Sequence, residues 1–274
     1  MMVSIVIVNY NSGHFLYECL KSINSYAGNN FEVIVVDNHS SDDSINECFS
    51  FFDNSKFRCI ILPDNLGFAK ANNVGAKESK GDIIHFLNPD TILREGMCSD
   101  YQQCLSEPTY IYINTLQNLD YSYVESKNLI PTLPNIFRKL FGATRCAYWY
   151  TGASVIISRF NYNKIGGWNE SYFMYSEDLD LFYKAQKIGL TVKSLPTIIT
   201  HAGGGSSSKV WNNYERELIV QNSFRHFFIV NGIKWQYPLV LILTFFRVLM
   251  IRPKQSLFFL RVWIKLNFSK KSKV

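Results

Sequence analysis

The run Val3-Ser-Ile-Val-Ile-Val8 decides the fold class of this chain. It is short, rich in β-branched residues and nearly free of polar side chains, which is typical of a strand buried on both faces of a parallel sheet. Three further runs of this kind follow it, and each ends in polar or turn residues: 31–36, 58–62 and 82–87. We therefore predict four buried parallel strands in the first third of the chain.

Residues with helical spacing separate these strands. They cover 15–26, 44–52 and 69–79; the second stretch follows the capping-type run Ser40-Ser-Asp-Asp43 and the third is closed by Gly81. Strands that alternate with helices predict an open, doubly wound α/β sheet, in which ligands bind at the carboxyl ends of the strands. All four strand ends are polar here: Asn9-Tyr-Asn11, Asp37-Asn38, Asp64-Asn65 and Asn88-Pro-Asp90.

The remainder of the chain is less regular. Residues 94–149 show only a helix near 95–105 and a loop-rich stretch. Regular patterns return as a strand at 153–158, a helix at 177–187 and two short strands at 191–195 and 197–201. The run Gly203-Gly-Gly-Ser-Ser-Ser208 that follows is predicted to be a mobile loop.

Composition excludes several classes of protein. Of 274 residues, 47 % are hydrophobic and 18 % charged, which excludes a disordered or fibrous chain. The six cysteines show no Cys-x-x-Cys spacing and no secretory signal precedes them, so we expect neither a zinc site nor a disulfide framework. The default compartment is the reducing cytosol.

Charge is unevenly distributed. Residues 218–274 hold ten Lys or Arg and no Asp or Glu, whereas residues 1–217 hold 18 basic and 22 acidic residues. The most apolar stretch, 237–246, is far shorter than the roughly 20 residues of a spanning helix. Aromatic and basic residues beside short apolar helices favour an interfacial anchor on an anionic membrane surface. The alternative is a helical hairpin packed on the rest of the protein, with a solvated basic tail.

Two nucleotide-binding motifs are absent. A dinucleotide-binding domain carries Gly-x-Gly-x-x-Gly after its first strand, where this chain has Asn9-Tyr-Asn-Ser-Gly-His14. No Gly-x-x-x-x-Gly-Lys run is present either. The absence of a glycine-rich, lysine-bearing loop also disfavours a nucleotidyltransferase.

A set of motifs in a fixed order resembles family 2 glycosyltransferases of the GT-A fold, and within them bacterial rhamnosyltransferases of cell-surface polysaccharide biosynthesis. The resemblance covers roughly residues 3–210. It implies a Rossmann-like, mostly parallel central sheet flanked by helices, with C-terminal amphipathic helices. The motifs are Ser4-Ile-Val-Ile-Val-Asn-Tyr-Asn-Ser12, Val35-Val-Asp-Asn38, Asn65-Leu-Gly-Phe-Ala69, Leu87-Asn-Pro-Asp-Thr91, Gly166-Gly-Trp-Asn-Glu170, Phe173-Met-Tyr-Ser-Glu-Asp-Leu-Asp180 and His201.

The resemblance also implies an activity: inverting transfer of a sugar, rhamnose from dTDP-rhamnose, to a saccharide or polyprenyl-diphosphate-linked saccharide. It implies a catalytic domain with a nucleotide-sugar half near 1–93 and an acceptor half near 94–217. The change in charge after residue 217 sets the limits of this domain at 1–217, and the basic, aromatic composition of 218–274 predicts a membrane-associating extension. The expected location is the cytoplasm, peripheral on the inner face of the cell membrane. No nucleic-acid partner is expected.

Asp90 and His201 are the predicted metal ligands. Asp90 lies where the family places the second aspartate of its Asp-x-Asp motif, and a carboxylate suits Mg²⁺ or Mn²⁺. Asn88 replaces the first aspartate, so it is assigned to substrate binding. His201 matches a position near the end of the catalytic domain. A Pro turn with a capping Asp90, and a structural role for His201, are the alternatives.

Family analogy assigns further residues to the nucleotide-sugar donor. Asp37 would hydrogen-bond the base or ribose, and its alternative is an Asx turn. The other predicted donor contacts are Val8, Asn9, Tyr10, Asn65, Gly67 and Asn72.

Asp178 is the predicted catalytic base. An inverting transfer needs a group that takes the proton from the acceptor hydroxyl, on the face opposite the departing diphosphate. By family analogy Glu177 is predicted to contact the acceptor or the backbone. Trp168 is predicted to stack on an acceptor sugar, and its alternative is a place in the core. Acidic residues in a first helical turn also stabilise a helix start, which is the alternative for Asp178.

Two other functions remain open at this point. The same fold can use UDP-galactofuranose, UDP-galactose or UDP-N-acetylglucosamine. A non-catalytic nucleotide-sugar-binding subunit of an assembly is the second, and Asn88 is its only support.

Overall fold

The computed structural model describes residues 2–52, 55–203 and 212–251. The chain forms two compact units: unit 1 contains Met1–Asn128, Trp149–Phe173 and Glu177–Val210, and unit 2 contains Leu129–Tyr148, Met174–Ser176 and Trp211–Val274. The boundary expected after residue 217 falls inside helix α9 (Asn213–Val230), because the loss of acidic residues there does not coincide with a break in the helix. The predicted assignment of functions to the two parts of the chain stays a prediction.

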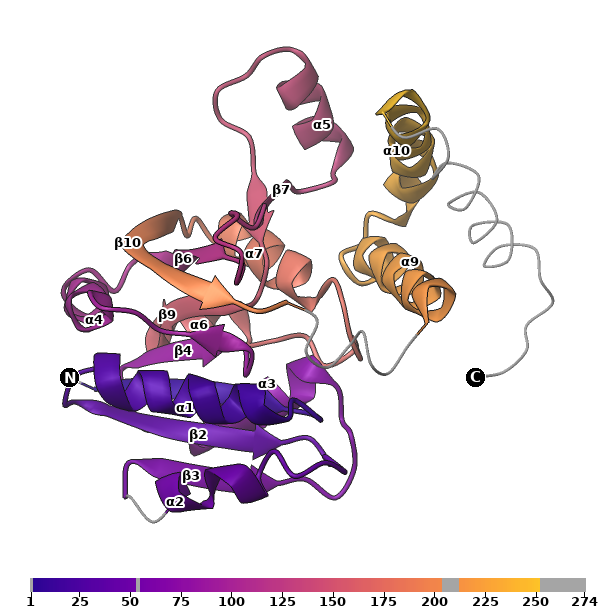
Figure 1. The fold of residues 1–274 in the computed structure, drawn as a ribbon. Coiled ribbons are helices and arrows are strands. Elements are labelled where there is room, and N and C mark those ends of the chain that lie inside the picture. Colours follow the sequence, from indigo (N-terminus) through magenta and orange to yellow (C-terminus); the bar gives the residue numbers. More distant parts are fainter. Residues whose placement is uncertain (1, 53–54, 204–211, 252–274) are drawn as a thin grey trace. The chain divides into compact units, whose positions relative to one another are not determined.

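Unit 1 is built on one eight-stranded sheet with the order β3-β2-β1-β4-β9-β6-β10-β5. β9 runs antiparallel to β4 and β6, and β5 runs antiparallel to β10, while the other neighbours are parallel (Figure 1). The predicted mostly parallel α/β sheet is thus confirmed. The strands are β1 (Val3–Asn9), β2 (Phe31–Asp37), β3 (Phe57–Ile61), β4 (Ile83–Leu87), β5 (Thr91–Ile92), β6 (Ile111–Gln117), β9 (Ser154–Ser158) and β10 (Val192–His201).

Helices cover both faces of this sheet because β1 is apolar on both faces. Ile5 and Ile7 join the cluster that contains α1 and α4, whereas Val6 joins the cluster of α3, α6 and α7. Each such side chain, fully buried, contributes about 1.5–3 kcal/mol. The close approach of α3 to β1 requires Gly75, since a Cβ there would collide with Val6. The helices are α1 (His14–Tyr26), α2 (Phe49–Phe52), α3 (Phe68–Glu78), α4 (Met97–Ser106), α6 (Arg159–Ile165) and α7 (Glu177–Lys187).

Unit 2 is helical. It holds α5 (Leu133–Leu140), α9, the 3-10 turn η2 (Lys234–Gln236) and α10 (Tyr237–Ile251). A two-stranded sheet of β7 (Lys127–Leu129) and β8 (Tyr148–Tyr150) lies where the chain passes between the units. The backbone N–H of Leu133 donates to Oε1 of Gln236 over 2.8 Å, which ties the start of α5 to η2. Across the described ranges, no helix combines the length and the apolar character needed to cross a bilayer.

The structure corrects four expectations. Residues 44–52 form a 3-10 turn η1 (Asn46–Cys48) and the short α2 instead of one helix. Residues 94–149 contain the central strand β6, not only loops. The two pieces near 191–201 are one strand, β10, with a register shift between Ser194 and Ile198. β3 is only partly buried because it is an edge strand. The predictions for 204–208 and for 252–274 lie outside the described residues.

A buried histidine joins the sheet to α4. His85 on β4 is fully buried, with Nδ1 2.7 Å from the Tyr101 hydroxyl and Nε2 2.9 Å from Oγ of Ser154. The Ser154 hydroxyl itself donates to Asn114, so it accepts from His85 Nε2–H, and Nδ1 accepts from Tyr101. Burial lowers the pKa of His85 to about 3, so the imidazole is neutral in the folded protein.

This neutral histidine makes stability depend on pH. The unfolded chain binds a proton at His85 below a pKa of about 6.5, whereas the folded protein does not. Stability is therefore complete above pH 6.5 and falls below it. Between pH 7.5 and 5.5 we expect the wild type to lose about 1.3 kcal/mol more than His85→Gln, measured by urea unfolding. Equal losses of unfolding free energy in the two proteins would show that His85 has the same pKa in the folded and unfolded states.

Candidate active site

The ends of β1 and β2 are joined by a buried polar network. Asn9 is fully buried, and its Nδ2 donates to Oδ1 of Asp37 and to Oγ of Ser44, each over 2.8 Å. The Ser12 hydroxyl donates to Asn9 Oδ1, and the Ser40 backbone N–H donates to Asp37 Oδ2. The Asn9 amide is thus used inside the protein. It holds the Asp37 carboxylate at the carboxyl edge, the edge where β1, β2, β4 and β10 end.

The loop before α3 lies on the same edge. Nδ2 of Asn38 donates to Oδ1 of Asn65 over 2.8 Å, and the same Asn65 oxygen accepts the backbone N–H of Gly67 over 3.0 Å. Gly67 has φ of 83° and stands against the carbonyl of Phe173, so a side chain there would be both strained and obstructed. The next N–H, of Phe68, donates to that carbonyl over 3.0 Å.

Two other residues that were predicted to contact the donor, Val8 and Asn72, are buried within the protein. Val8 is buried in an apolar cluster with Ile34 and Val36. Asn72 is buried within α3, where its Nδ2 donates to the carbonyl of Phe68. The structure therefore gives both side chains packing partners, while the side chain of Tyr10 is half-buried at the end of β1.

Asp90 and His201 meet at the carboxyl edge. His201 Nε2 lies 3.4 Å from Oδ1 of Asp90, and the backbone N–H of Ala202 donates to the Asp90 carbonyl over 2.9 Å. The antiparallel pairing of β10 with β5, which places His201 opposite Thr91, produces this contact. Asn88 is half-buried, and its backbone N–H donates to the carbonyl of Ala153.

This pair fits a divalent cation chemically. A carboxylate oxygen and an imidazole nitrogen on neighbouring strand ends are ligands that Mn²⁺ accepts, and diphosphate oxygens can supply other positions. Among the residues that the structure describes, no group of three or more His, Cys, Asp and Glu is placed to share one metal ion. Asp90 and His201 therefore suit a site that the substrate itself would complete.

Asp178 reaches the same edge from α7. Its Oδ2 accepts the backbone N–H of Gly152 over 3.2 Å, and its Oδ1 accepts that of Leu179 over 2.8 Å. Gly152 precedes β9, whose first residue pairs with Leu87 at the end of β4. Asp178 is half-buried, whereas its neighbour Glu177 is buried.

Burial gives the two acids different protonation states. It raises the pKa of Glu177 to about 8, and the neighbouring Asp178 charge acts in the same direction. Burial also raises the pKa of Asp178, to about 6, although the N–H groups of Leu179 and Gly152 favour its charged form. At pH 7 the pair therefore carries one charge, on Asp178, and Glu177 is protonated.

Trp168 lies beside this pair. A Cβ built on Gly152 would have both the Trp168 ring and Asp178 as neighbours, at 3.6 and 3.5 Å. Trp168 Nε1 and Glu177 Oε2 are buried and find no hydrogen-bond partner within the described part of the chain. Buried polar atoms are normally satisfied, so these two atoms, one on the residue next to Asp178 and one on a ring that lies beside Gly152, favour a ligand that supplies partners. Asp180, in contrast, is fully buried and paired with Lys184 over 2.8 Å.

Sequence reasoning missed several members of this site. Ser40 lies in the run interpreted as a helix cap and Ser44 begins the helix expected after it, yet both hydroxyls accept from Asn9 Nδ2. No role is predicted for Gly152, and Ser12 appears only as the last residue of a family motif, because a single small residue carries no pattern of its own. Asn38 belongs to a strand end and to the motif Val35-Val-Asp-Asn38, neither of which assigns it a contact of its own. Ser40 and Ser44 follow β2, and Asn9 ends β1. Their contact could have been predicted only from the expectation that neighbouring parallel strands end at the same edge of the sheet.

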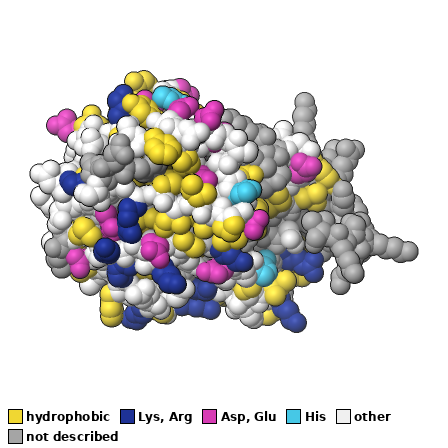
Figure 2. Space-filling view, turned by 90° about the horizontal axis from the view of Figure 1, so that it is seen from below, with side chains coloured by type: hydrophobic (Ala, Val, Ile, Leu, Met, Phe, Trp, Pro, Cys, Tyr) yellow, Lys and Arg dark blue, Asp and Glu magenta, His cyan; other side chains and the backbone are white. Residues whose placement is uncertain are grey.

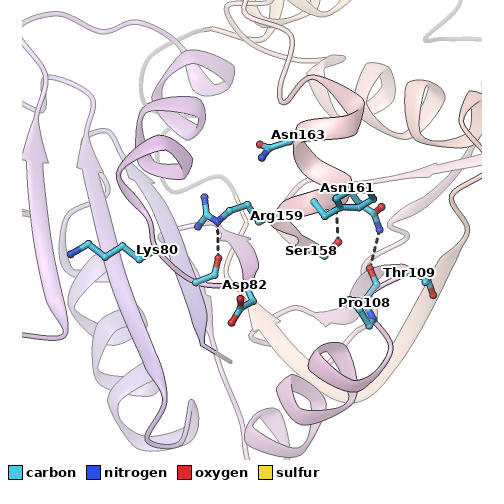
Figure 3. Close-up of a pocket in the computed structure, with 10 residues that line it drawn as sticks. Lys80, Asp82, Pro108, Thr109, Ser158, Arg159, Asn161 and Asn163 are labelled. Carbon is cyan, nitrogen blue, oxygen red and sulfur yellow. Dashed lines mark hydrogen bonds between the residues drawn. The ribbon is translucent and has the colours of Figure 1, made fainter.

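A cavity of about 560 Å³ lies at the other end of the strands (Figure 3). Asp82 precedes β4, and Ser158 ends the antiparallel β9. The Arg159 guanidinium donates to the carbonyls of Gly81 and Ala76 and to the Ser79 hydroxyl. These bonds connect the start of α6 to the end of α3 and the loop that follows it. No predicted site residue lines this cavity.

Comparison with known proteins agrees with this architecture. Residues 4–169 match the family described as Glycosyl transferase family 2, and the chain belongs to that family. It is 32 % identical over 123 residues to glycosyltransferase GlyG of Streptococcus pneumoniae, an alignment that spans 44 % of this chain and 41 % of GlyG. It is 24 % identical to the low-salt glycan biosynthesis hexosyltransferase Agl10 of Haloferax volcanii, over 80 % of this chain and 75 % of Agl10.

Solved structures confirm the GT-A fold. Residues 1–349 of S. aureus TarS in complex with UDP-GlcNAc superpose with a TM-score of 0.58 at 18 % identity, covering 82 % of this chain and 67 % of that one. The predicted family and fold are therefore confirmed. The chain spans less than half the length of GlyG, so its own activity and substrates are matters for proposal.

The buried acid pair predicts a stabilising substitution. A raised folded pKa means that the protonated Glu177 costs stability increasingly as pH rises above the unfolded value of about 4.5. Glu177→Gln removes this cost, so its gain in unfolding free energy should be about 1–3 kcal/mol larger at pH 7.5 than at pH 5. Urea unfolding at both pH values measures it, with Glu95→Gln on the exposed surface as control. A pH-independent gain would contradict the raised pKa.

Proposed function

We propose that this protein is an inverting glycosyltransferase that moves one sugar from a nucleoside-diphosphate donor to a hydroxyl of a saccharide or lipid-linked saccharide. One observation carries the proposal: four side chains from separate parts of the chain stand at one edge of one sheet. They are Asp37 on β2, Asp90 in the turn before β5, His201 on β10 and Asp178 on α7. A nucleotide contact, a cation pair and a base are the groups that such a transfer needs in one place.

Asp178 is the proposed base. It is charged at pH 7, half-buried, and held by two backbone N–H groups, so its carboxylate is oriented before substrate arrives. It takes the proton from the acceptor hydroxyl as that oxygen attacks the anomeric carbon. The bond between this carbon and the diphosphate breaks on the opposite face. Protonated Glu177 adds no second charge and can donate a hydrogen bond to the acceptor.

Asp90 and His201 are the proposed holders of Mg²⁺ or Mn²⁺. Such an ion, when bound, would neutralise charge on the departing diphosphate. Asp37, fixed by Asn9, is proposed to accept a hydrogen bond from the base or ribose of the donor. Asn65 and Gly67 are proposed to contact the ribose and phosphates of the donor.

The donor sugar rests on resemblance alone. We propose rhamnose from dTDP-rhamnose, because the ordered motifs resemble rhamnosyltransferases of cell-surface polysaccharide assembly. A UDP-sugar is the second candidate, favoured by the UDP-GlcNAc complex of the structurally similar TarS. Transfer to a polyprenyl-diphosphate-linked acceptor at the inner membrane face would suit the basic, aromatic chain after residue 218.

Nucleotide binding tests the proposal most directly. Calorimetry with dTDP, UDP and GDP, with and without Mn²⁺, should give metal-dependent binding of one nucleotide. A preference for dTDP supports rhamnose, and a preference for UDP supports the second candidate. His201→Ala should remove most of the increase that Mn²⁺ produces, with Glu95→Gln unchanged. Binding of none of the three nucleotides would overturn the proposal.

Replacement of the base separates binding from transfer. Asp178→Asn should lower the turnover rate about 10²–10⁴-fold while nucleotide affinity stays within about twofold, because the amide keeps the shape but takes no proton. Turnover of the wild type should also fall below pH 6, where Asp178 is protonated. Transfer at the wild-type rate by Asp178→Asn would place the base elsewhere. Nucleotide binding without transfer by the wild type would favour a non-catalytic subunit.

A further inference from the structure

Helix α5 ends in an exposed apolar tip. Leu133 and Asn135 on its inner side are buried, whereas Phe137, Leu140 and Phe141 are 48, 67 and 85 % exposed. The rings of Phe137 and Phe141 stack with centroids 6.5 Å apart, so they form one surface. Leaving three large apolar side chains in water is unfavourable, and clusters of this kind mark binding surfaces.

The charged residues that neighbour this tip along the chain are all basic. Arg138, Lys139 and Arg145 are exposed beside it, and the sequence holds no Asp or Glu from Ser126 to Asn169. Unit 2 as a whole contains fourteen Lys and Arg but two acidic residues, Glu215 and Glu217. Elsewhere charges are mixed: the face in Figure 2 shows acidic, basic and apolar side chains interspersed.

A second apolar surface belongs to the same unit. On α10 the exposed side chains recur at helical spacing, and Trp235 at the preceding turn is 62 % exposed. Opposite them Val240 and Leu241 are buried. Because Gln236 of η2 accepts the N–H of Leu133, α5 and α10 are anchored to the same turn. The exposed stripe is Leu239, Ile242, Leu243, Phe246, Leu249 and Met250.

We propose that the α5 tip, defined as residues 137–141, inserts into the interface of an anionic lipid bilayer. Aromatic and aliphatic side chains would enter the boundary between headgroups and acyl chains, and Arg138 and Lys139 would meet lipid phosphates. The helix of eight residues is about 12 Å long, enough to lie in the interface but not to cross it. This inference rests on the proposed function for its purpose, which is access to a lipid-linked acceptor.

Charge argues against a second copy of the chain as the occupant. A two-fold dimer through the tip would bring Arg138 and Lys139 of one protomer to the same residues of the other, since such interfaces are self-complementary. Like charges at close range are repulsive. An anionic lipid surface matches both the apolar side chains and the cations.

Cosedimentation of the full chain with vesicles tests the proposal. The wild type should bind phosphatidylcholine vesicles that contain phosphatidylglycerol more tightly than pure phosphatidylcholine vesicles. The variant F137S/L140S/F141S should bind the anionic vesicles about tenfold more weakly. R138Q/K139Q should lose about tenfold or more on anionic vesicles and little on neutral ones. Phe160→Ser, an exposed phenylalanine of unit 1, is the matched control and should bind like the wild type.

Three results would overturn the inference. The first is that the wild type does not bind anionic vesicles. The second is that F137S/L140S/F141S binds them as tightly as the wild type does. The third is that light scattering shows a wild-type dimer and that this variant loses the dimer but keeps its vesicle binding. Nucleotide calorimetry on the same samples separates the two proposals. Vesicle binding that depends on the tip, without nucleotide binding, would contradict the proposed function alone. Nucleotide binding without vesicle binding would contradict this inference alone.

Discussion

The structure depends on the burial of β1 on both of its faces. All seven residues of the strand are buried, and it pairs in parallel with β2 on one side and β4 on the other. A shift of one residue would exchange the side chains that face α1 with those that face α3, so the register is strongly specified. That register brings Asn9 level with Asp37, and the polar edge of the sheet follows from it.

The candidate site departs from the rules that hold in the core. Around β1 every apolar side chain is covered, and the buried His85 has a partner on each ring nitrogen. On Trp168 and Glu177, two buried polar atoms find no hydrogen-bond partner among the described residues, and burial raises the pKa of the Glu177 carboxyl to about 8. Such sites reduce stability, and proteins keep them where a ligand completes the arrangement. The same contrast distinguishes Asp178 from Asp180, whose ion pair serves the fold.

Sequence patterns predicted the elements whose neighbours are close along the chain. β1, β2, β4 and α7 were expected within a residue or so of their observed bounds, because uniform apolar runs and helical spacing define them. β6 escaped prediction because its polar Asn114 interrupts the apolar run; this side chain is buried and donates to the Thr197 carbonyl. Pro196 divided β10 into two apparent strands, although the chain continues through a register shift.

For the candidate site, too, the sequence predicted individual residues but not the contacts between residues that are distant along the chain. Strand ends pointed to Asp37 and Asp90, and resemblance pointed to Asp178 and His201. The contact between Asp90 and His201 was not predictable, because it depends on an antiparallel pairing of β5 with β10 between residues more than a hundred positions apart. The buried amide of Asn9 was assigned to substrate because a strand end does not reveal which partners its side chain finds.

The loop before α3 and the segment before α7 are joined by main-chain atoms: the N–H of Phe68 and the carbonyl of Phe173. The Phe173 side chain is itself 48 % exposed. Natural selection can therefore exchange residue 173 for almost any other while the bond persists, whereas residue 67 must stay glycine. In an alignment of descendants, position 67 would be invariant and position 173 would vary freely. Covariation between the two positions would therefore not reveal that the two segments are in contact.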